Sequence, residues 1–282
     1  MIHVTCFALA LHGVAEEVRG SYPEVEKLTA NGKKIFIKSP LRMQKFKEEA
    51  PTLPLPPTAH CNTLGTWLDV ANYYCTNYCQ IEKIFNKFDR KDSSSIKSVQ
   101  ELFSVTMSRN LAYIKANFRG ISKSITCLET VGTQLCDSIN IVKQTESEFS
   151  LVQGEVANKV NAKLQSVLER NPGYSTLCKV SDILCGNKAE LGGNKQGHSA
   201  NDLTLFKYSP VTSFDVDRSF SSYKVQLSDN RSPSSLTILK CISSSTATLP
   251  KTKAKLSYKF FIIVKSKYIS PFIMQKVNSV YL

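Results

Sequence analysis

Apolar residues recur at three- and four-residue intervals through the middle of this 282-residue chain, and this spacing constrains its fold most strongly. Such a period places apolar side chains on one face of an α-helix. Four helical patterns follow one another between residues 67 and 168, with short polar segments between them. The chain is therefore predicted to be mainly α, with a helical bundle at its centre.

Each of the four predicted helices has its own apolar face. The first is a long helix with Trp67, Val70, Tyr74, Tyr78, Ile81, Phe85 and Phe88. The second follows a capping cluster at 92–95 and carries Val99, Leu102, Phe103, Thr106, Leu111, Ile114 and Phe118. The third carries Ile125, Leu128, Leu135, Ile139 and Val142, and the fourth Val156, Val160, Leu164, Val167 and Leu168. The aromatic residues of the first helix could stack on nucleic-acid bases, but the aliphatic residues among them favour core packing.

Residues 1–58 predict a short strand followed by helices. His3 to Cys6 is typical of a strand, and the next helix ends at Ser21-Tyr22-Pro23. From Glu24 to Ala50 we expect short helices, broken at Asn31-Gly32 and at Ser39-Pro40. Four prolines between 51 and 57 then predict a stiff, extended connector.

The net charge of +13 is concentrated near the C-terminus. No acidic residue follows Asp229, and the nine Lys and Arg residues beyond it leave only +4 for the rest of the chain. This basic tail is a candidate for nucleic-acid binding, or it is a terminus with no selected role. The candidate residues are Lys251, Lys253, Lys255, Lys259, Lys265 and Lys267.

A second group of basic residues occurs near the N-terminus and has two interpretations. Its members are Lys33, Lys34, Lys38, Arg42, Lys45 and Lys47. They could form a face that binds a phosphate backbone. The neighbouring Glu24, Glu26, Glu48 and Glu49 equally favour an ordinary solvated surface.

Nine cysteines without a regular spacing indicate reduced thiols rather than a secreted disulfide framework. Cys75 and Cys79 are four residues apart on the first predicted helix, so both thiols would share one face. His60 and Cys61 lie nearby in sequence, which makes a zinc site conceivable. Structural zinc sites usually place a cysteine pair in a turn, so we expect buried thiols and no metal here.

The stretch from Asp202 to Arg231 contains the most informative short motif. Asp217-Arg218 directly precedes Ser219-Phe220-Ser221, and a Ser/Thr-rich turn comes before it. This arrangement resembles the C-terminal dimerisation region of hAT-type DNA transposases, whose pattern is (S/T)xxxERxFS. In that family the Glu of the motif completes a set of metal-binding carboxylates, and here its position holds Asp217.

Three further segments resemble the same family in the expected order, so that the resemblance spans about residues 2 to 231. HVTCFALALHGVAEEVR is similar to the region after the family's second catalytic Asp, although Leu9 replaces the His of its Cys-x-x-His. GTWLDVANYY follows the position of an Arg-Trp motif, where this chain has Thr63 and Leu64. LETVGTQLCDSINIVKQTESEF, with the segments after it, resembles a helical insertion of invertebrate members.

The resemblance implies a ribonuclease-H-like α/β core with an all-helical insertion. It also implies two-metal DNA strand transfer, in which three carboxylates hold Mg²⁺ around the scissile phosphate. The family's first two catalytic Asp residues and most strands of its core sheet would lie upstream of this sequence. We therefore expect a helical bundle with a remnant of that core, most sheet strands missing, no enzymatic activity and no cofactor.

The same reasoning predicts five segments. They are a ribonuclease-H-like remnant at 1–58, a helical insertion bundle at 59–186, a flexible linker at 187–200, the hAT dimerisation motif at 201–231 and the basic tail at 232–282.

The function expected from these observations is that of a catalytically inactive, transposase-derived fragment that dimerises. Its dimer contacts would come from Phe214, Val216, Phe220, Tyr223 and Leu227. The expected partners are a second copy or related transposase-derived proteins, with DNA as a candidate and no membrane. The alternatives are nucleic-acid binding through the basic tail, and a nuclease or transposase that needs a partner. A nuclear location is expected from the family and from Lys251-Thr252-Lys253-Ala254-Lys255.

Overall fold

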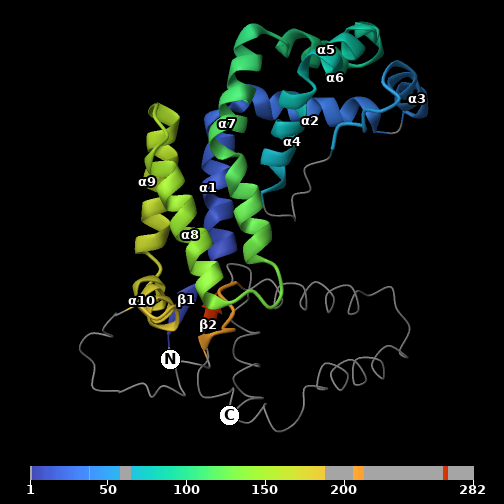
Figure 1. The fold of residues 1–282 in the computed structure, drawn as a ribbon. Coiled ribbons are helices and arrows are strands. Elements are labelled where there is room, and N and C mark those ends of the chain that lie inside the picture. Colours follow the sequence, from blue (N-terminus) through green and yellow to red (C-terminus); the bar gives the residue numbers. More distant parts are fainter. Residues whose placement is uncertain (1, 38, 58–64, 188–205, 213–262, 266–282) are drawn as a thin grey trace, which may run out of the picture. The chain divides into compact units, whose positions relative to one another are not determined.

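The computed structural model describes residues 2–37, 39–57, 65–187, 206–212 and 263–265, and these are mainly helical, as predicted (Figure 1). From the N-terminus the elements are β1 (His3–Thr5), α1 (Phe7–Ser21), α2 (Pro23–Phe36), α3 (Pro40–Glu49), α4 (Thr66–Thr76), α5 (Tyr78–Asn86), the 3₁₀ helix η1 (Arg90–Asp92), α6 (Ser94–Leu102), α7 (Val105–Leu128), α8 (Leu135–Ser150), α9 (Glu155–Glu169), α10 (Tyr174–Leu184) and β2 (Ile263–Lys265). No helix in the described ranges is long and apolar enough to cross a bilayer.

The chain divides into two compact units, each discontinuous in sequence. The larger contains residues 8–127 and 142–167, and the smaller contains residues 1–7, 128–141 and 168–282. The five segments predicted from the sequence are continuous, because they follow composition and the family resemblance rather than contacts within the fold. The two units therefore do not test the boundaries of these segments, which stay predictions.

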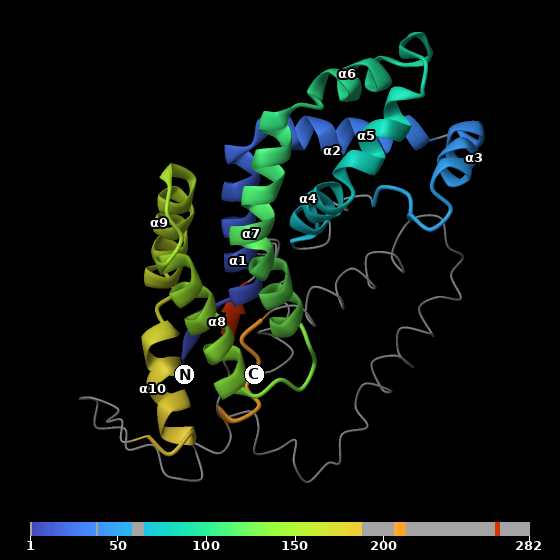
Figure 2. The same cartoon turned by 45° about the horizontal axis from the view of Figure 1, so that its top comes forward.

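In the larger unit, α1 and α7 lie side by side (Figures 1 and 2). The predicted apolar stripe of α1 is buried, with Leu11, Val14 and Val18 all at most 1% exposed. The strand and the helix predicted for residues 3–21 are therefore confirmed, including the end of α1 before Pro23. The helix α2 packs against α3, α4 and α6.

The predicted break at Asn31-Gly32 is wrong, because α2 runs through both residues. Gly32 is buried inside this helix, and a β-carbon there would collide with the Tyr74 hydroxyl of α4. The glycine therefore permits close approach of two helices rather than a turn. The break at Ser39-Pro40 is confirmed, since α3 begins at Pro40.

The long helix predicted from Trp67 to Phe88 is divided at Asn77 into α4 and α5. The Asn77 side chain donates a 2.9 Å hydrogen bond to the carbonyl of Tyr73, which also accepts the Asn77 backbone N–H. Asparagine competes in this way with regular helical bonding, so it favours helix ends. The apolar period continues across the break, which is why the sequence pattern does not reveal it.

The second predicted helix is also two helices, α6 and α7, separated at Phe103-Ser104. The capping cluster that begins it is confirmed, because the Ser93 hydroxyl accepts the N–H of Ser95. At the break, the hydroxyl of Tyr78 accepts the Ser104 N–H and donates to the Ser104 carbonyl, both at 2.9 Å. Ser104 then caps α7 by accepting the Met107 N–H.

The third predicted helix spans a turn that the structure places between α7 and α8. Ile125 and Leu128 end α7, whereas Leu135 begins α8. Gly132, with a φ of +82°, occupies the left-handed region in that turn. The fourth predicted helix is confirmed as α9, which ends before Asn171-Pro172-Gly173.

In the smaller unit, β1 pairs in parallel with β2, with Val4 opposite Val264. On β1, Thr5 is also held by Asn171, whose Oδ1 accepts the Thr5 N–H at 3.2 Å and whose Nδ2 donates to the Thr5 carbonyl at 3.1 Å. The sequence indicates the turn at Asn171-Pro172-Gly173 only as the end of a helix. In the structure, Asn171 of this turn also holds the first strand.

Candidate interaction surfaces

Most residues that the sequence singles out for function lie outside the described residues. These include Asp217 and the dimerisation residues Phe214, Val216, Phe220, Tyr223 and Leu227. Of the six candidate tail lysines, only the backbone of Lys265 is described, and it lies in β2 opposite Thr5. The dimerisation and tail assignments therefore stay predictions.

The expected thiol environment at Cys75 and Cys79 is corrected by the structure. The break at Asn77 places Cys75 in α4 and Cys79 in α5, where Cys75 is half-buried and Cys79 is exposed. The expectation of two buried thiols on one continuous helix is thus wrong. His60 and Cys61 lie outside the described residues, and within those residues no three His, Cys, Asp or Glu side chains form a group that could hold a metal.

Two members of the N-terminal basic group have roles within the fold. The Arg42 guanidinium donates to the carbonyl of Ile35 at 3.2 Å and to that of Asp92 at 3.3 Å. The Lys45 ammonium donates to the Lys87 carbonyl at 3.2 Å and lies 5.7 Å from the centre of the Phe88 ring. These contacts direct both cations toward backbone oxygens and an aromatic face. Among the described residues of this group, Lys33, Lys34 and Lys47 remain candidates for binding a phosphate.

The neighbouring acidic residues have partners of their own. Glu26 accepts two hydrogen bonds from Arg19, at 2.8 and 2.6 Å, and this bidentate pair raises the pKa of the Arg19 guanidinium. Glu49 pairs with Lys87, and Glu48 accepts from Gln44. These three acids are therefore paired with Arg19, Lys87 and Gln44, and their described contacts do not neutralise the lysines of the N-terminal basic group.

The aromatic stripe of the first predicted helix belongs to the core. Trp67, Tyr74 and Phe85 are at most 4% exposed, and only Tyr78 is half-buried. Their ring faces are covered by neighbouring side chains, so they offer no platform for base stacking. The prediction of core packing is confirmed.

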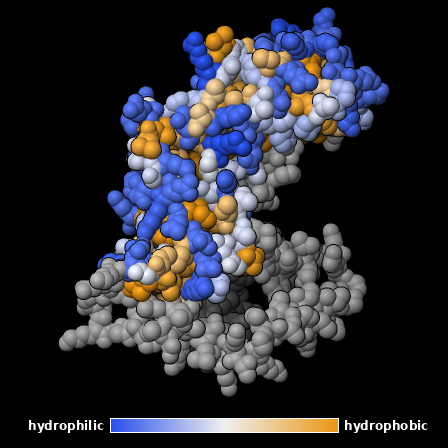
Figure 3. All heavy atoms as spheres, viewed as in Figure 1, coloured by the Kyte–Doolittle hydropathy of each residue, from blue (hydrophilic) through white to orange (hydrophobic). Residues whose placement is uncertain are grey.

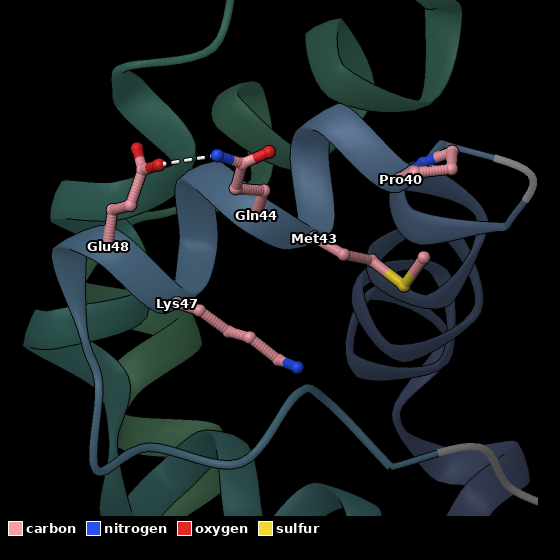
Figure 4. A pocket seen from close by; sticks show the side chains of 5 residues that line it. All are labelled: Pro40, Met43, Gln44, Lys47 and Glu48. Carbon is pink, nitrogen blue, oxygen red and sulfur yellow. Dashed lines mark hydrogen bonds between the residues drawn. The ribbon is translucent and has the colours of Figure 1, made fainter.

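A shallow hollow lies on the surface of α3. It has a volume of about 480 Å³ and is lined by Pro40, Met43, Gln44, Lys47 and Glu48. Met43 and Lys47 extend from one side of the helix, while Gln44 and Glu48 lie together on another side, joined by a hydrogen bond (Figure 4). Phe46 is the only buried residue of α3 and packs edge-on to Phe36. Most of this helix therefore faces solvent.

Large apolar side chains that are exposed occur singly on several described elements. Figure 3 shows hydrophobic residues scattered among hydrophilic ones on the face that it presents. The exposed residues are Ile37, Leu41, Val105, Val131, Leu151 and Tyr208. Ile37 and Leu41 flank the start of α3, next to its hollow, and Leu41 is 80% exposed.

A pair of thiols in the smaller unit has no signal in the sequence. Cys136 is the second residue of α8, and Cys185 directly follows α10. Their side chains interact with each other, although 48 residues separate them. Spacing rules for cysteines cover short intervals, so this pair could be found only from the fold.

No family model, no curated protein and no solved structure matches this chain. The resemblance to hAT-type transposases therefore rests on the sequence segments themselves.

Proposed function

We propose that this chain is a transposase-derived interaction protein that dimerises and does not catalyse strand transfer. The observation that carries the proposal is the motif from Ser213 to Ser221, which resembles the hAT dimerisation pattern. Support comes from the succession of helices between residues 66 and 184, where the resemblance implies a helical insertion. In this proposal residues 1–58, which contain β1, α1, α2 and α3, represent the remnant of a ribonuclease-H-like core.

The proposed loss of catalysis follows from the carboxylates. Two-metal strand transfer requires several acids that converge on both cations, because charge on the attacking and leaving oxygens must be offset together. At the matching motif this chain supplies Asp217, which is one methylene shorter than the family's Glu. Plasmid nicking in Mn²⁺ or Mg²⁺ that the change Asp217→Ala abolishes would contradict this part of the proposal.

Dimerisation is tested by size-exclusion chromatography with light scattering over a range of protein concentrations. The wild type should show a monomer–dimer equilibrium. Phe220→Asp places a charge in the proposed apolar contact, so it should raise the dimer dissociation constant by about 100-fold or more.

Leu41→Asp is the matched control, because it makes the same change of character at a side chain that is 80% exposed on α3. It should leave the dimer unchanged. If Leu41→Asp dissociates the dimer and Phe220→Asp does not, the contact surface is α3 and the assignment to residues 214–227 is wrong. A wild type that is monomeric at every concentration would overturn dimerisation altogether.

The charge asymmetry favours a second candidate function, nucleic-acid binding through the tail. Substituting Gln for Lys251, Lys253 and Lys255 should weaken binding to a DNA duplex and reduce its salt dependence. Substituting Gln for Lys33 and Lys34 of α2 tests the other candidate basic group, and it should have less effect if the tail is the binding site. These substitutions are preferable to deleting the tail, because deletion also removes β2 from its pairing with β1.

A further inference from the structure

Cys136 and Cys185 converge on one carbonyl oxygen in the smaller unit. The Sγ of Cys136 donates to the oxygen of Ser181 at 3.6 Å, and the backbone N–H of Cys185 donates to the same oxygen at 2.9 Å. The two thiols also lie within hydrogen-bonding reach of each other. The start of α8 and the end of α10 thus bring together two sulfur atoms that are not bonded.

We propose that Cys136 and Cys185 form a redox-modification site, at which a hydroperoxide converts the two thiols into a reversible disulfide. The bridge links the start of α8 to the end of α10. This site is independent of the proposed dimerisation, since it rests on the described contacts of Cys136, Ser181 and Cys185 and uses none of residues 214–227.

The two cysteines have different roles because their exposure differs. Cys185 is exposed, so hydrogen peroxide reaches its sulfur first, whereas Cys136 is half-buried. Burial, the neighbouring Cys185 and Asp137 raise the pKa of the Cys136 thiol, although its bond to Ser181 opposes them. Peroxide therefore oxidises Cys185 first, and Cys136 serves as the resolving thiol because its sulfur lies beside that of Cys185.

The chemistry balances in two steps. The Cys185 thiol reacts with hydrogen peroxide to give a sulfenic acid and one water, so that sulfur is oxidised and peroxide is reduced. The Cys136 sulfur then attacks the sulfenic sulfur, forms the S–S bond and expels a second water. A dithiol such as dithiothreitol reverses the change by thiol–disulfide exchange.

Among the other described cysteines, Cys75 and Cys79 provide a control. They belong to adjacent helices of the larger unit, and Cys79 is exposed like Cys185. Exposure alone would make Cys79 equally sensitive to peroxide. The arrangement at Ser181 adds a second feature to Cys185, because it brings the Cys136 thiol within hydrogen-bonding reach.

The test uses the purified full chain, treated with increasing hydrogen peroxide and then with N-ethylmaleimide to block remaining thiols. Digestion with trypsin and a glutamate-specific protease releases residues 130–143, which contain Cys136, and residues 180–188, which contain Cys185. Mass spectrometry without reduction should detect these two peptides joined, with the loss of two hydrogen atoms. Dithiothreitol should separate them.

Cys136→Ser and Cys185→Ser should each abolish the joined peptide, whereas Cys79→Ser should retain it. The oxidised wild type should also unfold at a temperature roughly 5 °C higher than the reduced protein, because the bridge restricts the unfolded chain. This shift should be absent from both pair variants and present in Cys79→Ser. Failure to find the joined peptide, or a bridge from Cys185 mainly to another cysteine, would overturn the proposal.

Discussion

At the residue scale, Tyr73 and Tyr74 of α4 are neighbours whose hydroxyl groups differ in their hydrogen bonding. The Tyr73 hydroxyl donates to the carbonyl of Pro54. The Tyr74 hydroxyl is fully buried against Gly32 and has no hydrogen-bond partner among the residues that the structure describes. Burial raises the pKa of both phenols above their ordinary value. A buried hydroxyl without a partner costs free energy, because it has lost its water and gained nothing in exchange.

The two tyrosines therefore predict opposite effects of the same substitution. Tyr74→Phe removes the unpartnered hydroxyl and should raise the free energy of unfolding by about 1 kcal/mol. Tyr73→Phe is the matched control and should lower it by about 1 kcal/mol, because it removes a bond to Pro54. Urea denaturation followed by circular dichroism measures both. A loss of stability in Tyr74→Phe as large as that in Tyr73→Phe would contradict this account.

At the scale of the element, the sequence predicts the helices well and their breaks poorly. Apolar residues such as Val14 in α1 and Val160 in α9 follow the helical period and are buried. That period reports which side of a helix is covered, but it passes unchanged through Asn77 and Ser104. At both positions side-chain hydrogen bonds decide where the backbone turns, and the Ser104 bond comes from Tyr78, which is distant in sequence.

Gln100 of α6 shows how one such polar contact joins elements. Its amide nitrogen, Nε2, donates to the carbonyls of Phe85 and Phe88 at 2.7 and 3.0 Å, while its Oε1 accepts from Arg90 at 2.8 Å. The amide thereby adds a donor to carbonyls at and just beyond the end of α5, where helical N–H donors run out, although the Phe85 carbonyl also accepts the Phe88 N–H at 3.1 Å.

Replacing this amide tests its importance. Gln100→Met keeps the length of the side chain but leaves the carbonyls of Phe85 and Phe88 without this donor, so it should cost about 2–3 kcal/mol of stability. Arg90→Ala removes only the third bond and should cost about 1 kcal/mol or less. Chemical denaturation of both variants measures the difference. Equal losses would show that the amide does not support the end of α5.

At the scale of the whole molecule, the pairing of β1 with β2 joins residues near opposite ends of the sequence. His3 to Cys6 predicts a strand, but no local pattern identifies its partner across more than 250 intervening residues. For the motif from Ser213 to Ser221 the opposite holds. Its sequence resembles the hAT pattern, but its residues lie outside the described part of the chain. Sequence thus suggests an interaction surface, whereas structure supplies the long-range contacts.

Deleting residues 232–282 should therefore destabilise the smaller unit, because it removes β2 and leaves β1 with one unpaired edge. The expected cost is about 1–3 kcal/mol, since only a three-residue strand loses its partner. Deleting residues 268–282 shortens the same tail but keeps β2, so its stability should match the full chain. Amide hydrogen exchange shows where stability is lost. The Thr5 amide serves as the internal reference, because its bond to Asn171 does not involve β2 and is kept in both variants. Faster exchange of the other β1 amides only in the longer deletion is the expected result, and equal exchange in both variants would show that β2 does not hold the strand.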